Sequence, residues 1–196
     1  MNAEAHLQDS SAVYQKKLQI NRLGLWLFLI SDAFMFGGLM VTRGVLWVDT
    51  RPDLNQILGL IVTVVLLVSS FFMNRAETAM AHGDKKEFIR GTAITLALGI
   101  IFLVGVVGLE WPLASSHGIT PGKDVYGAVF FMMTGMHAFH VLTGIIFLVI
   151  ILRNGMRDLY SAEKHLAVEA AAVYWHFIDV VWIFFYPAIY LIGQVV

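Results

Sequence analysis

The sequence has no cysteine among its 196 residues, and only 14% of its residues are charged. The first absence excludes disulfide bonds, thiolate metal sites and covalently attached c-type haem. The second argues against an ordinary soluble domain, in which about 25% of residues are charged. A net charge of −1 argues against a nucleic-acid-binding surface. With 58% hydrophobic residues and a mean hydropathy of +0.74, the composition predicts an integral membrane protein.

Five apolar segments are long enough to cross a membrane as helices, since about 20 residues are needed. They are continuous rather than alternating, which favours helices over barrel strands. Short polar stretches with turn residues separate them, and no signal peptide is evident at the start. We therefore predict an all-α polytopic membrane protein: an N-terminal arm (1–22) followed by a single five-helix transmembrane domain (23–193). The predicted spans are 23–42, 54–73, 91–111, 126–152 and 168–192, and the second is expected to continue as helix into residues 74–83.

The basic residues predict the orientation, because cytoplasmic loops carry an excess of Lys and Arg. Three basic residues lie in the N-terminal arm, four in the second loop and three in the fourth, so ten of the 13 lie on one side. Only Arg43, Arg51 and Lys123 lie on the other. The N-terminus is therefore predicted to be cytoplasmic and the C-terminus outside. The aromatic residues expected near the outer interface are Trp47, Trp111, Tyr126 and Tyr190.

Two aspartates lie near the middle of predicted spans, where an aspartate exposed to lipid costs about 2.5–3.5 kcal/mol. Asp32 follows Arg22 by ten residues and precedes Arg43 by eleven, so it lies about 15 Å from either along a helix. Asp179 occupies a similar position in the fifth span. Both side chains must face the bundle, a partner or a wet cavity. Two interpretations remain open: a hydrogen-bonded group that fixes packing or docks a partner subunit, and a proton-relay carboxylate.

Three histidines also lie inside the spans. His137 and His140 share one helix face, as do His176 and Asp179. Gly144 continues the first of these faces, so another helix can approach the histidines closely. A haem would need histidines on facing helices, and a metal ion would need three or four converging ligands. Because no Glu-x-x-His companion accompanies the two histidines of the fourth span, we predict no metal ligand.

No phosphate-binding loop or nucleophile elbow is present, so we predict no catalytic or cofactor-binding residue in this chain. Trp175 and Trp182 are expected to cover the bundle rather than to stack on a cofactor. The glycines expected to make helix-packing contacts are Gly37, Gly38, Gly105 and Gly108. The intramembrane polar residues predicted to have a structural or proton-related role are Asp32, Glu110, His137, His140, His176 and Asp179.

Four segments resemble one known family in the order in which that family has them. YWHFIDVVWIFFYPAIYLIG (174–193) closely resembles the last helix of subunit III of haem–copper respiratory oxidases. YGAVFFMMTGMHAFHVLTG (126–144) is similar to the helix before it, with Thr-Gly-x-His and His-Val. LWLFLISDAFMFGG (25–38) resembles the helix in which a buried acid follows a serine, and LGIIFLVGVVGLEW (98–111) one in which an acid precedes an aromatic residue. The resemblance covers residues 22–193.

The resemblance implies a five-helix bacterial form of subunit III, matching the last five helices of the seven-helix members. Such a subunit is accessory and holds no redox cofactor, because the haems and copper belong to partner subunits. The implied partners are oxidase subunit I, in direct contact, the other oxidase subunits and membrane lipids, among which a bound phospholipid is allowed. The implied role is to support proton uptake and turnover stability of a proton-pumping terminal oxidase in the inner (plasma) membrane. Asp32 stands where many members have glutamate.

Three other functions remain open at this point. A related subunit III-like protein accompanies nitric oxide reductase, and the identity of the co-purifying partner would separate the two. A small proton-coupled transporter would use Asp32 and Asp179, and it would require flux by the chain alone. A di-histidine haem protein would be pigmented when the chain is isolated.

Overall fold

A computed structural model describes residues 2–195, with side chains from Gln15 onward. In this part of the chain five helical segments are long and apolar enough to cross a membrane, which confirms the predicted fold class. The third span is built from three consecutive helical elements. The elements are α1 (Asn2–Trp47), β1 (Thr50–Arg51), α2 (Gln56–Ala81), α3 (Lys85–Leu103), the π-helix η1 (Val104–Glu110), α4 (Trp111–Ser116), α5 (Val125–Met156), α6 (Leu166–Tyr190) and β2 (Gln194–Val195).

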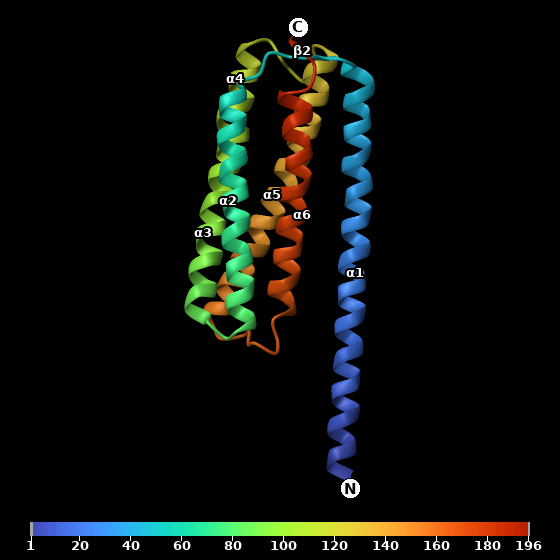
Figure 1. Cartoon of the computed structure of the whole chain (residues 1–196), viewed down its shortest axis with the longest axis vertical. Coiled ribbons are helices and arrows are strands. Elements are labelled where there is room, and N and C mark those ends of the chain that lie inside the picture. Colours follow the sequence, from blue (N-terminus) through green and yellow to red (C-terminus); the bar gives the residue numbers. More distant parts are fainter. Residues whose placement is uncertain (1, 196) are drawn as a thin grey trace.

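The helices run past the predicted ends of the spans. α2 continues to Ala81, as expected from the sequence. α1 is unbroken from Asn2, so the described part of the arm is helical and continuous with the first span. Residues 1–22 contain no glycine or proline, so no helix breaker separates the two. In Figure 1 α1 extends beyond the other helices at one end, while β2 lies at the opposite end.

Side-chain caps fix the start of three helices. Each capping side chain accepts a hydrogen bond from the backbone amide three residues later, satisfying one of the amides that a helix start leaves without a partner. Asp84 and Asp124 lie in polar stretches between the predicted spans, whereas Asn55 is the second residue of the predicted span 54–73. The bonds join Leu58 N to Asn55 Oδ1 at 3.0 Å, Glu87 N to Asp84 Oδ1 at 3.0 Å and Gly127 N to Asp124 Oδ1 at 2.7 Å.

α1 is the least buried helix of the bundle. Within its most apolar stretch 11% of the residues are buried, against 33–50% in the other four spans. Figure 1 shows α1 beside α6 and apart from α2 and α3. A single stripe of α1 faces α5 and α6, and its buried members are Leu29, Phe36, Arg43 and Trp47. The opposite face of α1 is exposed along its whole described length.

The end of the bundle that carries the C-terminal segment is closed by a short parallel pairing of β1 with β2. Arg43 donates to the backbone carbonyl of Ile192, and its guanidinium lies 5.2 Å from the centre of the Trp47 ring. Both Arg43 and Arg51 are buried, which was not predicted from the sequence. A basic residue near a predicted span end is ordinarily solvated, and only the returning C-terminal segment buries these two.

Two of the aromatic residues predicted at the outer interface lie inside the protein. Trp47 and Tyr190 are buried, and Trp47 packs against Tyr126 with ring centres 5.8 Å apart. Trp111 is half-buried and donates to Thr134 Oγ1 at 3.1 Å. These side chains therefore join helix ends to one another more than they face lipid headgroups.

The predicted packing glycines behave in two different ways. A Cβ built on Gly105 would lie 2.6 Å from Val62 Cγ1, so α2 approaches the third span closely there, as expected. Nothing lies within 4 Å of a Cβ built on Gly37 or Gly38, so these two make no close packing contact within the described chain. Both are on the exposed side of α1. Gly108 meets only Val104 of its own helix, at 3.5 Å.

Candidate functional site

The six predicted polar residues do not converge on one point. Asp32 and His140 meet between α1 and α5, whereas His176 and Asp179 share a face of α6, and Glu110 lies near the C-terminal end of the bundle. Across the side chains of residues 15–195, no three His, Cys, Asp or Glu groups are placed to hold one metal ion. The intramembrane polar groups therefore form separate local arrangements.

The Asp32–His140 pair is the only one that joins two of the six predicted residues across helices in the described structure. Asp32 Oδ2 lies 3.6 Å from His140 Nε2, which is too long for a hydrogen bond. His140 Nδ1 lies 2.7 Å from the Met136 carbonyl oxygen, which can only accept, so Nδ1–H donates a hydrogen bond to it. Nε2 is therefore the ring nitrogen that faces the carboxyl of Asp32. Tyr174 donates to the His140 carbonyl at 3.3 Å.

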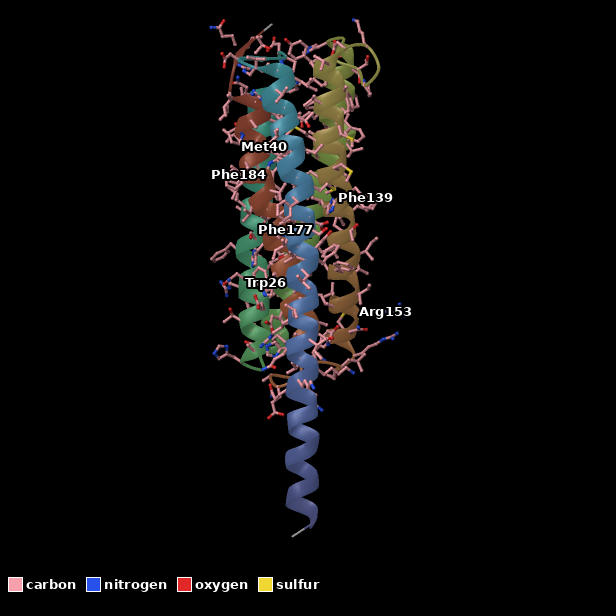
Figure 2. All side chains as sticks on the ribbon, turned by 90° about the vertical axis from the view of Figure 1, so that its right-hand side faces the viewer. Trp26, Met40, Phe139, Arg153, Phe177 and Phe184 are labelled. Carbon is pink, nitrogen blue, oxygen red and sulfur yellow. The ribbon has the colours of Figure 1, made fainter. Side chains whose placement is uncertain are left out.

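The Asp32–His140 pair lies near the surface of the chain. The side chains of Asp32 and His140 are 15% and 9% exposed. Phe36 packs edge-on against the imidazole with ring centres 4.8 Å apart and covers the side toward α6. In Figure 2, Phe139, the residue before His140, lies at the outer surface of α5 beside α1. Asp32 Oδ2 is nevertheless shielded from solvent and has no hydrogen-bond partner among the described residues.

His137 lies in the core and makes no hydrogen bond. It is fully buried, and neither ring nitrogen has a partner within the described residues. Its ring packs against Trp182 at 4.7 Å and Phe102 at 5.6 Å between centres. His140, three residues on along α5, is the nearest of the predicted residues along this helix face. His137 therefore acts as a packing ring between α3, α5 and α6.

The two tryptophans of α6 join it to α2. Trp175 Nε1 donates to Ser69 Oγ at 3.0 Å, and Trp182 Nε1 donates to Thr63 Oγ1 at 2.9 Å. Both indoles are buried, so the prediction that they cover the bundle is wrong, because they lie inside it. Sequence reasoning missed Ser69 and Thr63 because small hydroxyl residues in an apolar span commonly bond their own helix, as Thr63 also does to Gly59.

His176 and Asp179 lie on the side of α6 that faces α2. His176 Nδ1 and Ser70 Oγ are 2.6 Å apart, which places a hydrogen bond between the helices. His176 Nε2 is shielded from solvent and has no partner in the described part of the chain. Both carboxyl oxygens of Asp179 are likewise shielded from solvent and have no hydrogen-bond partner in the described part of the chain. Asp179 is buried and lies between Trp175 and Trp182 along the helix. These atoms are hydrogen-bonding groups that the fold of this chain does not satisfy.

Glu110 ends the π-helix η1 and is buried against α6. Tyr190 donates a hydrogen bond to Glu110 Oε1, while Oε2 has no partner among residues 15–195. A Cβ on Gly59 would lie 3.0 Å from the Tyr190 ring, so the absence of a side chain there leaves room for the tyrosine. A π-turn changes the helix register locally. The arrangement ties the third and fifth spans together at one end.

Replacing Tyr190 by phenylalanine is expected to lower the free energy of unfolding by about 1–3 kcal/mol, because it leaves both carboxyl oxygens of Glu110 buried without a donor. The measurement is an SDS titration of the purified chain in mixed micelles, followed by far-ultraviolet circular dichroism. Tyr186→Phe is the matched control, since Tyr186 stacks on Tyr190 but makes no side-chain hydrogen bond within the described residues. Equal losses in the two variants would contradict the role of the Tyr190 hydroxyl.

Comparison with known proteins gives consistent matches. The sequence profile of the family described as "Cytochrome c oxidase subunit III" matches residues 2–194. The "Cytochrome c oxidase subunit 3" of Thermostichus vulcanus is 34% identical over 179 residues, covering 88% of this chain and 87% of the relative. That of Equus caballus is 34% identical over 197 residues, covering 94% and 73%. That of Branchiostoma lanceolatum is 36% identical over 186 residues, covering 88% and 70%.

Proposed function

Because the chain belongs to the cytochrome c oxidase subunit III family, we propose that it is an accessory subunit of a proton-pumping haem–copper terminal oxidase. Its relatives are subunits of cytochrome c oxidase, an oxidoreductase complex of several subunits. In this proposal the haems and copper belong to partner subunits, and this chain has no catalytic residue and no redox cofactor of its own. It packs directly on subunit I.

One observation carries the proposal of direct packing on a partner: the one-sided burial of α1. A span of 33 residues rests on α5 and α6 through one stripe and leaves its other faces uncovered by the chain. Helices that associate within a membrane gain packing energy and hydrogen bonds from each other. A first helix supported on one side only is consistent with an oxidase subunit lying against another.

The proposed support of proton uptake rests on the Asp32–His140 pair. In this proposal a proton is exchanged between Asp32 Oδ2 and His140 Nε2, which lie 3.6 Å apart in side chains that are 15% and 9% exposed. Glu110, His137 and Asp179 are buried in the core, which favours a structural role for them. The proposed protection of the complex during turnover follows from the family alone.

The proposed orientation places the N-terminus in the cytoplasm and the C-terminus outside, in the plasma membrane. The turn between α2 and α3 and the loop between α5 and α6 lie at the end from which α1 extends (Figure 1). The ten basic residues counted from the sequence lie in the first part of α1, in the α5–α6 loop, and in the parts of α2, α3 and α5 next to this loop and the α2–α3 turn. The excess of Lys and Arg at that end supports the proposal.

The test is purification of the affinity-tagged chain in mild detergent, with a reduced-minus-oxidised visible spectrum of the product. We expect haem absorbance that leaves with the partner subunits when they are stripped away, and a colourless chain afterwards. Proton release and turnovers before inactivation are then compared for proteoliposomes with and without the chain, and both should fall in its absence. A haem-free preparation under gentle conditions would contradict the proposal. If the co-purifying enzyme is a nitric oxide reductase, the chain is instead the related subunit III-like protein of that enzyme.

A further inference from the structure

The polar contacts of α1 with the rest of the described chain are strongest where α1 ends. Near its start, Arg22 pairs with Glu169 of α6 at 2.8 Å, but both side chains are partly exposed, and such an ion pair contributes little to stability. In the middle, Asp32 and His140 lie 3.6 Å apart, beyond hydrogen-bonding distance. The other polar contacts lie at the end of α1, and the C-terminal segment (191–195) takes part in several of them.

The C-terminal segment returns to α1 because of the way in which α6 ends. The amides of Leu191 and Ile192 both donate to the Pro187 carbonyl at 3.0 Å, which closes the last turn of the helix. Gly193 follows with a φ of +108°, a conformation that residues with a side chain rarely adopt. A Cβ built on Gly193 would lie 2.8 Å from the carbonyl carbon and oxygen of Thr50. The turn and the close approach of the two backbones therefore both require glycine at this position.

Beyond Gly193 the segment bonds to the stretch of chain that leaves α1. Gln194 N donates to the Asp49 carbonyl at 2.7 Å, and β2 pairs in parallel with β1. Arg43 of α1 donates to the carbonyl of Ile192, just before the turn. In Figure 1 the chain that leaves α1 crosses the end of the bundle and passes β2 on its way to α2. The C-terminal segment therefore joins the end of α6 to the end of α1.

The backbone of α1's partner in this contact is strained. Val48, the first residue after α1, has a φ of +50°, which is an outlier for a β-branched residue and costs free energy. Its side chain is exposed, so packing is not what holds the residue there. Arg43 donates to its carbonyl at 3.4 Å, and the next residue, Asp49, accepts from Gln194. Strain of this kind persists only while the surrounding contacts hold it. Opening the two-residue pairing releases it, so the closed state is balanced against an open one.

We propose that residues 191–195 form a strap that opens and closes at the end of α1. When closed, the strap holds this half of α1 on α5 and α6 and keeps Asp32 beside His140. When open, it frees this half of α1, whose apolar stretch is only 11% buried and therefore has little packing of its own. The strap does not depend on which enzyme the chain accompanies, so it goes beyond the proposed function.

Hydrogen–deuterium exchange of the Gln194 amide measures how often the strap opens. The full chain is labelled with ¹⁵N-glutamine and studied by NMR in lipid nanodiscs. Gly193→Ala should raise the exchange rate about 5–30-fold, because alanine is strained at this φ and meets the Thr50 carbonyl. Val48→Asn should lower the rate about fivefold, because asparagine tolerates a positive φ. Gly122→Ala is the control, since nothing lies within 4 Å of a Cβ built there. Equal exchange rates in the three variants would overturn the strap.

Distances between spin labels show whether the strap holds α1. The chain has no cysteine, so a pair of introduced cysteines carries the only labels. With the strap removed, in a variant that ends at Ile192, the distance between α1 and α5 should lengthen and broaden near the strap and beside Asp32, and stay at the parent value near the opposite end. The three pairs of exposed positions that report these distances are, in that order, Val45–Met132, Phe34–Phe139 and Leu23–Ile150.

Far-ultraviolet circular dichroism of each variant shows whether the bundle still folds. Gly193→Ala should move the label distances in the same direction as the shortened chain, but by less. If the shortened chain does not fold, Gly193→Ala carries the same test, since it keeps every residue of the strap in place. Unchanged distances in a folded variant with an open strap would show that α1 is held without it and would overturn the inference. Haem in the purified complex tests the proposed function separately, so the two can fail independently.

Discussion

Replacing Trp175 by alanine is expected to lower the free energy of unfolding by about 3–5 kcal/mol, the usual loss for a buried aromatic residue. The indole is in contact with three other helices. A Cβ built on Gly99 of α3 would lie 2.6 Å from the ring, and one built on Gly144 of α5 would lie 2.9 Å from it. Nε1 donates to Ser69 of α2. Removal of this ring therefore leaves a cavity where α2, α3, α5 and α6 meet.

The loss is measured on the isolated chain by SDS titration in mixed micelles with circular dichroism as the signal. Trp26→Ala is the control, because Trp26 has the same side chain on the exposed side of α1. An exposed residue away from the core is expected to change stability by about 0.5 kcal/mol or less. Trp175→Phe separates the two contributions, since it keeps most of the ring and loses only the hydrogen bond to Ser69. Similar losses in Trp175→Ala and Trp26→Ala would contradict the assigned position of Trp175.

The membrane spans could be predicted because the lipid solvent leaves few alternatives. A continuous apolar run of about 20 residues has to be a helix there. The helix ends could be predicted less well, since caps such as Asp84 and Asp124 lie outside the apolar runs and extend the helices past them. The expectation that Gly144 lets another helix approach the histidines closely stays a prediction, since the absence of a side chain at Gly144 makes room for the Trp175 ring of α6.

Predictions that depend on which faces meet were less successful. Gly37 and Gly105 have the same apolar surroundings in the sequence, yet only Gly105 packs within the chain. Arg43 is buried because the C-terminal segment returns to α1, a contact between residues 149 positions apart. The Asp32–His140 pair likewise joins two spans that sequence spacing alone cannot align. Which helix faces which neighbour is decided by the tertiary packing, and a single sequence does not encode it in a readable pattern.

Adding a side chain at Gly144 is expected to destabilise the bundle, although glycine is itself a poor helix former. In an exposed helix, Gly→Ala is favourable by about 1 kcal/mol. At Gly144 the new Cβ would lie 2.9 Å from two atoms of the Trp175 ring, so the ring or the whole helix must move. The ring cannot retreat toward α3, because Gly99 already lies against its far side. We expect a net loss of about 1–3 kcal/mol for Gly144→Ala and a larger loss for Gly144→Leu.

Gly24→Ala is the matched control, since Gly24 is on the exposed side of α1 with nothing within 4 Å of a built Cβ. The two alanine variants should therefore change the thermal midpoint of the isolated chain in opposite directions, up for Gly24 and down for Gly144. Equal shifts would mean that the intrinsic helix preference outweighs the contact with Trp175.

A double variant shows whether the contact with Trp175 is the cause of the loss. In Trp175→Phe the smaller ring leaves room beside Gly144, so adding Gly144→Ala should cost less than it does beside tryptophan. Residues in direct contact typically couple by about 0.5–3 kcal/mol. Additive losses would place the strain elsewhere on α5. Coupling would show that one tryptophan seated between two glycines sets the distance between α3, α5 and α6. Trp175 and His176 also bond to Ser69 and Ser70 of α2, so the position of this tryptophan affects how the α6 face that carries His176 and Asp179 packs on α2.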